Sequence, residues 1–211
     1  DDIFMIFDII QTKSGKYDAE FEIKDKNCEP LGSISFKGGD LKKGTFTIHF
    51  KDKTYHMSET VMEKNDEVVL FPYTILADDK ETATLYQTEQ VEEQATFYKL
   101  HTDNHVYSLY STHFGKRDTA LNLYDEEKQI ARLEFDYEVD GEYKYTYHVY
   151  GLDQDDVAIS SIFFCMYYYI LHDYLPGDEA PRIRNYSNKV NEWLYSKYNP
   201  HFISHIAQGT R

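Results

Sequence analysis

Residues 155–175 read DDVAISSIFFCMYYYILHDYL, and their centre is the one long apolar run without charge in the chain. Asp155 and Asp156 stand where a helix places its N-cap and first-turn carboxylates, which accept unpaired backbone N–H groups. Pro176-Gly177 follows at the other end, where a helix cannot continue. The apolar side chains between these marks lie all round a helix rather than on one stripe. The pattern therefore predicts a helix over 156–175 that is buried on every side.

The length of this run also allows a second interpretation, a membrane anchor through residues 157–175, because roughly 20 apolar residues cross a bilayer. However, Ser160 and Ser161 lie early in the run, and tyrosines fill positions 167–169. Tyrosine is typical of the bilayer interface rather than its centre, and no cluster of Lys or Arg flanks the run. The sequence favours a helix buried in a water-soluble fold, with no membrane span.

The composition indicates one acidic domain that is rich in aromatic residues. Of its 211 residues, 41% are hydrophobic and 16% aromatic, with 20 Tyr and 13 Phe. This length suits a single domain with an appendage, and the aromatic residues favour strands. The formal net charge of -15 repels phosphate backbones, so we expect no nucleic-acid partner.

The cysteines and the N-terminus favour a cytoplasmic location. Cys28 lies in a predicted turn and Cys165 in the middle of the apolar run, so we expect free thiols, as in a reducing compartment. The first residues, DDIFMIFD, show neither the basic region nor the cleavage site of a signal peptide.

Short β-type segments separated by turns fill the chain before residue 151, which indicates an antiparallel sandwich or barrel. The predicted strands are 3–10, 19–23, 31–36, 45–50, 54–57, 68–73, 96–100, 106–111, 121–124, 130–137 and 143–150. Residues 78–93 are compatible with a surface helix or an acidic loop, although alternating threonines and apolar residues slightly favour a strand. The hairpins 21–36 and 121–135 are similar in pattern, either as two ordinary hairpins or through duplication. Each offers one apolar face, and a barrel that holds the apolar helix would cover these faces.

The order of segments resembles the tubby-like superfamily, which includes the LURP-one-related proteins and the phospholipid scramblases. The resemblance rests on TALNLY at 119–124, QIARL at 129–133, YTYHVY at 145–150 and DDVA at 155–158, followed by the apolar run to LHD at 171–173. It extends over residues 3–175 and is a pattern of hydrophobicity and order, not of catalytic residues.

This resemblance implies a mostly β (β+α) fold, an antiparallel β-barrel of about twelve strands around a central hydrophobic helix, with a helical C-terminal extension. The barrel would take residues 1–175 with the central helix at 156–175, and the extension residues 176–211. The chain departs from the family in function-bearing features. It lacks the basic surface of phosphoinositide-binding members and the cysteine cluster and calcium-binding stretch of scramblases.

The C-terminal extension has the pattern of one amphipathic helix. Ser187 or Asn188 would cap it, Asn199-Pro200 would end it, and one face would carry the apolar residues Val190, Trp193, Leu194 and Tyr198. Such a helix either packs on the outside of the barrel or docks a protein partner or a second copy of the chain. Trp193, Leu194 and Tyr198 are the candidate docking residues.

The sequence predicts no catalytic residue, cofactor or metal site. Nucleotide-binding, serine-hydrolase and zincin motifs are absent. His101 and His105 flank a turn, and His201 with His205 has no third ligand. Asp153-x-Asp155 lacks the glycine and the closing glutamate of a calcium loop, so helix capping explains it better.

Two function hypotheses follow. The first is a non-enzymatic binding or interaction module whose unknown partner is a lipid, a small ligand or a protein. The alternative is an enzyme with a site of scattered Tyr, His and Asp at a barrel mouth. A deep pocket with converging polar groups would favour the enzyme, and a filled barrel with an exposed aromatic patch would favour the module.

Overall fold

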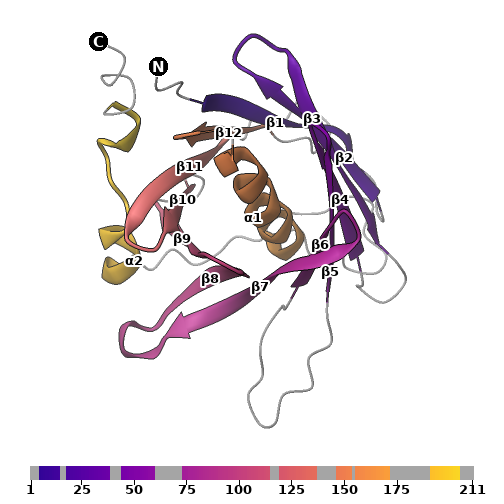
Figure 1. Ribbon diagram of the computed structural model, residues 1–211. Helices are drawn as coiled ribbons and strands as arrows, with labels where there is room; N and C mark the ends of the chain where they lie inside the picture. The colour runs from indigo at the N-terminus through magenta and orange to yellow at the C-terminus, as the bar shows by residue number, and fades with distance from the viewer. Residues whose placement is uncertain are drawn as a thin grey trace, which may run out of the picture.

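Twelve strands close into one antiparallel barrel around helix α1 in the part of the chain that the computed structural model describes (Figure 1). The described residues are 5–14, 18–38, 44–59, 73–114, 119–136, 146–153, 155–171 and 191–204. The strands are β1 (Met5–Ser14), β2 (Asp18–Asp25), β3 (Pro30–Gly38), β4 (Gly44–Phe50), β5 (Lys53–Glu59), β6 (Tyr73–Ala77), β7 (Lys80–Gln90), β8 (Ala95–Thr102), β9 (Val106–His113), β10 (Thr119–Asp125), β11 (Lys128–Asp136) and β12 (Thr146–Gly151). The helices are α1 (Asp155–Leu171), α2 (Glu192–Ser196) and the 3-10 turn η1 (Val91–Glu93). The predicted fold class is confirmed.

Each strand pairs with its neighbours in the sequence, and β1 closes the barrel by pairing with β12 from Met5↔Gly151 to Ile10↔Thr146. Alternate side chains point inward, as Ala19, Phe21 and Ile23 of β2 do. One close approach requires a glycine. A Cβ on Gly32 of β3 would lie 2.1 Å from the carbonyl oxygen of His49 on β4.

Helix α1 fills the interior, as its all-round apolar pattern predicts. From Val157 to Tyr168 every side chain is buried except that of Ile159, which is half-buried. Phe164 packs edge-on against Phe21 of β2 and Tyr147 of β12, with ring centroids 5.1 and 4.5 Å apart. The predicted end of the helix, residues 172–175, lies outside the described residues. Among those that are described, no helix is both long and apolar enough to cross a membrane.

The start of α1 differs in detail from the prediction that Asp155 caps it. The side chain of Asp153 accepts the backbone N–H of Asp156 at 3.1 Å, and the side chain of Asp156 accepts that of Asp153 at 3.0 Å. This reciprocal arrangement is a capping box, in which the cap lies three residues before its partner. Asp155 is exposed and lies in the first turn.

One strand prediction is confirmed, and a second lies mostly outside the described residues. Residues 80–93 form β7 and η1, so the strand favoured within 78–93 is confirmed and extends to Gln90. Of the predicted strand 68–73, only Tyr73 is described, and the strand that begins there continues to Ala77. The hairpins 21–36 and 121–135 are β2–β3 and β10–β11.

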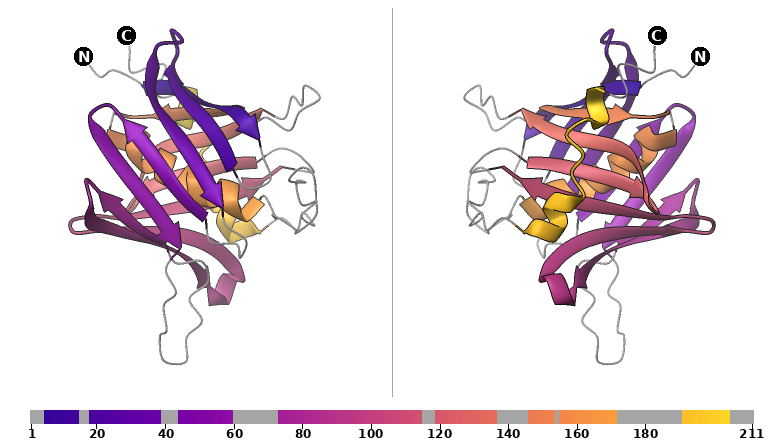
Figure 2. Two further views of the ribbon diagram at one scale, coloured as in Figure 1. Left: turned by 90° about the vertical axis from the view of Figure 1, so that its right-hand side faces the viewer. Right: turned by 90° about the vertical axis from the view of Figure 1, so that its left-hand side faces the viewer.

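The C-terminal segment, residues 191–204, crosses the outside of the barrel, and we call it the strap (Figure 2). Its helix α2 is shorter than predicted. Asn191 caps it by accepting the N–H of Leu194 at 3.0 Å, and it ends at Ser196 rather than near Tyr198. The predicted caps, Ser187 and Asn188, lie outside the described residues. The helix ends early because the main chain beyond it turns its carbonyls toward the barrel.

Candidate functional site

Part of the outer face of β8–β11 is buried although it points away from the barrel interior. On β10 and β11, apolar neighbours on both sides of Asn122 and Arg132 pack into the core around α1. Alternation therefore turns Asn122 and Arg132 outward, yet Asn122 is fully buried and Arg132 is only 1% exposed. The strap covers them, so this face and the strap form one site.

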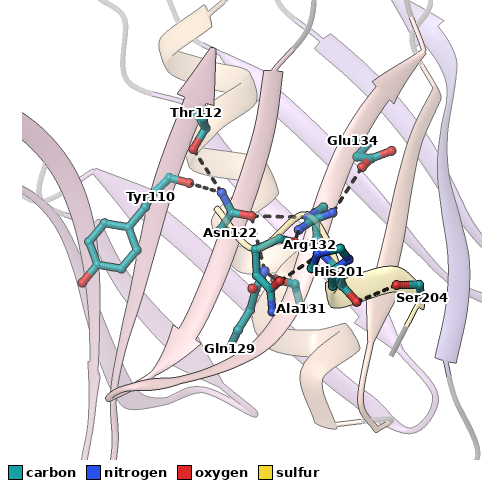
Figure 3. A network of polar contacts seen from close by, with 10 residues as sticks. Tyr110, Thr112, Asn122, Gln129, Ala131, Arg132, Glu134, His201 and Ser204 are labelled. Atoms are coloured by element: carbon teal, nitrogen blue, oxygen red, sulfur yellow. Dashed lines mark hydrogen bonds and ion pairs between the residues drawn. The ribbon is translucent and has the colours of Figure 1, made fainter. Parts of the chain in front are cut away.

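Arg132 is the charged centre of the site (Figure 3). Its Nε donates a hydrogen bond to Asn122 Oδ1 at 3.4 Å, and a terminal nitrogen donates to the carbonyl of Asn199 in the strap. The guanidinium also lies 4.5 Å from the ring centre of Tyr198 and 5.6 Å from that of Phe202. Burial lowers the pKa of Arg132 from its ordinary value, but a guanidinium stays charged at neutral pH. The strap thus supplies an acceptor and two aromatic faces to a buried cation.

Three adjacent strands each donate one hydrogen bond to the main chain of the strap. Thr112 Oγ1 of β9 donates to the carbonyl of Leu194 at 3.3 Å, and Tyr124 OH of β10 donates to that of Lys197 at 2.6 Å. Arg132 of β11 donates to that of Asn199. All three contacts recognise backbone atoms and therefore do not depend on the side chains at these positions.

An aromatic cluster anchors the helical end of the strap. The ring of Trp193 lies 5.4 Å from that of Phe97 on β8 and 5.5 Å from that of Tyr110 on β9. Lys197 Nζ lies 5.0 Å from the ring centre of Trp193, within the range of a cation–π contact. Asn191 adds a hydrogen bond from Nδ2 to the carbonyl of Glu93 at 3.0 Å.

The structure brings the three candidate docking residues together on this face. Trp193 packs on aromatic rings, Leu194 offers its carbonyl, and Tyr198 stacks on Arg132. In this structure they dock on the barrel of their own chain. An aromatic edge remains open beside them, where Phe114 is 39% exposed and Tyr195 48% exposed, with ring centroids 5.8 Å apart.

The sequence did not identify Thr112, Asn122, Tyr124 or Arg132 as site residues. A polar residue between two apolar residues of a strand is typical of any barrel exterior, so these positions carry no distinctive local signal. The one available signal was the amphipathic pattern around Trp193, which predicts an apolar contact but not its location.

Other polar groups have structural explanations. Within the described ranges, no three His, Cys, Asp or Glu side chains are grouped to hold a metal ion. His101 contacts Tyr86 OH at 2.8 Å, and the exposed His105 pairs with Asp125 at 3.2 Å. Both cysteines are free, and burial raises the pKa of the Cys165 thiol well above its ordinary value. A buried thiol of this kind is unreactive.

Comparisons of the chain with protein-family models, with curated proteins and with solved structures find no match.

Proposed function

We propose that this chain is a non-enzymatic binding module with a tubby-like barrel, and that its recognition surface is the outer face of β8–β11. The observation that carries the proposal is the set of three side chains, Thr112, Tyr124 and Arg132, that hold main-chain carbonyls of the strap. Main-chain hydrogen bonds supply affinity, while pockets for a few side chains supply specificity. The face therefore suits a peptide segment with aromatic residues spaced like Trp193 and Tyr198.

The filled interior supports a module over an enzyme. Helix α1 occupies the barrel, and the cavity that opens at one mouth has a mainly apolar floor. His105 and Asp125 at this mouth form a solvent-open pair, which is typical of a surface salt bridge. The family part of the proposal draws support from the helix that follows the last strand into the barrel, as the resemblance implies.

The partner is a peptide segment that competes with the strap. A second copy of the chain is one candidate, because its strap carries the same carbonyls and aromatic side chains. We also propose a cytoplasmic location, for which the free thiols of Cys28 and Cys165 are the support.

The test measures binding of a labelled peptide of residues 191–204 to the full chain. In wild type, the tethered strap competes at an effective concentration on the order of millimolar, so the peptide should bind weakly. Trp193→Ala in the full chain removes the aromatic anchor, and we expect at least about tenfold tighter peptide binding, measured by fluorescence anisotropy.

Two matched controls make this test specific. Adding Arg132→Met to the Trp193→Ala chain removes the donor to Asn199 and should abolish peptide binding. A peptide that itself carries Trp193→Ala should bind about tenfold less tightly than the natural peptide. Equal binding of the natural peptide to wild type, to the Trp193→Ala chain and to the Trp193→Ala chain with Arg132→Met would refute the proposed surface.

A further inference from the structure

A cavity of about 320 Å³ opens at the mouth of the barrel where α1 begins. It lies between the start of α1 and the inner sides of β5–β8. Its floor is apolar and is formed by Ile75, Ala77, Ala83, Leu100, Ile159 and Ile162. Small-molecule sites have volumes of roughly 300–1,000 Å³ and are lined mainly by apolar groups, so the size and lining fit this class.

The cavity exists because small side chains face the first turns of α1. Alanines at positions 77 and 83 leave space that larger residues fill elsewhere around the helix. Ile159 faces this space and is the one side chain between Val157 and Tyr168 that is only half-buried. Protein interiors are otherwise packed as densely as organic crystals, so an open apolar space of this size is an exception. It holds roughly ten methylene-sized groups, if each takes about the 30 Å³ of a water molecule.

The charge around this mouth is strongly negative. The chain turns here at 25–29, 51–53, 78–80, 103–105, 125–128 and around the start of α1 (152–153 and 155–156), because alternate turns of an antiparallel barrel lie at the same end. These six stretches contain twelve Asp or Glu and five Lys. The positive end of the α1 dipole also lies here, but Asp153, Asp155 and Asp156 offset it.

The rim of the cavity itself carries charges of both signs. Asp103 and Lys53 both line it, together with Asn104 and the Asp125-paired His105. Burial raises the pKa of the neighbouring Tyr55 phenol; Lys53 lowers it, and the carboxylates of Asp78, Asp155 and Asp52 raise it further. Because the six turns at this mouth contain twelve carboxylates and five lysines, the field at the opening favours a cation.

We propose that this mouth cavity binds a small amphipathic cation, an amine with a linear hydrocarbon body of about eight carbons. The hydrocarbon lies on the floor between α1 and β5–β8, and the ammonium stays at the opening near Asp103. This site is inside the barrel, whereas the strap lies outside it, so the proposal does not rest on the peptide-binding surface.

The experiment compares octylamine, octanol and octanoate on the full chain by isothermal titration calorimetry below the self-association limit of each probe. The three probes share one hydrocarbon and differ in head-group charge. We expect octylamine to bind about three- to tenfold more tightly than octanol, and octanoate to bind most weakly. Added salt should reduce the advantage of the amine. Tighter binding of octanoate would assign the site to anions through Lys53 and overturn the proposal, as would the absence of saturable octylamine binding.

Variants separate the cavity from the acidic surface. Ala77→Phe fills the cavity without changing charge and should weaken octylamine binding at least about tenfold. Ala83→Leu is a second filling variant, in case the first does not fold. Asp103→Asn should weaken octylamine binding about threefold. Glu127 is an exposed carboxylate at the same mouth but does not line the cavity, so Glu127→Gln should leave octylamine binding unchanged. Unchanged octylamine binding in both filling variants would show adsorption to the surface and refute the site.

Discussion

Asp156 shows, at the scale of one residue, how burial and hydrogen bonding have opposite effects on the pKa of a carboxylate. Burial and the neighbouring charge of Asp153 raise its pKa to about 6, although it accepts backbone N–H groups from Leu152 and Asp153. The pKa is therefore higher in the folded than in the unfolded chain. The folded state binds more protons between about pH 4 and about pH 6, so the contribution of Asp156 to stability falls as pH rises through this window.

Asp156→Asn should flatten this part of the pH dependence. Asparagine keeps an oxygen that accepts the backbone N–H groups of the cap, but it carries no charge to bury. The free energy of unfolding, measured with urea at about pH 4 and about pH 7, should fall less with rising pH in the variant than in wild type. Asp155→Asn, at an exposed position of the same turn, is the control. Parallel pH profiles for wild type and Asp156→Asn would contradict the raised pKa.

Arg132 marks the limit of what single residues reveal in the sequence. Strand alternation correctly turns both Asn122 and Arg132 outward, and on that basis alone they would be exposed. Their burial depends on the strap, whose Asn199 lies 67 positions beyond Arg132. No local pattern encodes so distant a contact, so the candidate site could not be predicted from its barrel residues.

At the scale of elements, the β6–β7 turn places an Asp where glycine is favoured. Asp78 and Asp79 both have left-handed backbones, with φ of 47° and 64°. Left-handed φ at both central residues defines a type I′ hairpin turn, which favours Asn or Asp first and glycine second, so Asp78 suits its position and Asp79 does not. The structure stabilises the turn by a hydrogen bond from the N–H of Asp78 to the carbonyl of Thr54 on β5.

Asp79→Gly should therefore stabilise the protein by about 1 kcal/mol, because glycine enters the left-handed region without a Cβ penalty. The measurement is the midpoint of urea unfolding, compared between proteins whose free energy of unfolding has the same dependence on urea concentration. Asp52→Gly in the β4–β5 turn is the matched control, since Asp52 is not among the positive-φ residues and glycine there should only increase the entropy of the unfolded chain. Destabilisation by Asp79→Gly would show that its side chain makes a contact that outweighs the strain.

Elements with a complete local pattern were predictable. The apolar run of α1 and the alternation of β2–β3 and β10–β11 each identify the element and the face that it buries. The tail helix was predicted too long because its spacing continues to Tyr198, while the carbonyls of Lys197 and Asn199 turn to donors on the barrel. Tertiary hydrogen bonds outweighed helical propensity there.

At the scale of the whole molecule, the strap adds to a core that closes without it. The pairing of β1 with β12 leaves the sheet no free edge, and α1 fills the interior through contacts with the strands. The strap instead contacts the outer face of β8–β11. The barrel and the strap should therefore differ in their importance for folding.

Deletion of residues 191–211 should leave a folded barrel that is less stable by about 2–4 kcal/mol, because Arg132 and Asn122 lose their cover and Trp193 its burial. Far-UV circular dichroism should retain the strand signal, and urea unfolding should remain cooperative with a lower midpoint. The full chain with Trp193→Ala is the matched control and should fall between wild type and the deletion. Loss of cooperative unfolding in the deletion would show that the strap is part of the folding core, in which case no partner peptide could replace it without unfolding the barrel.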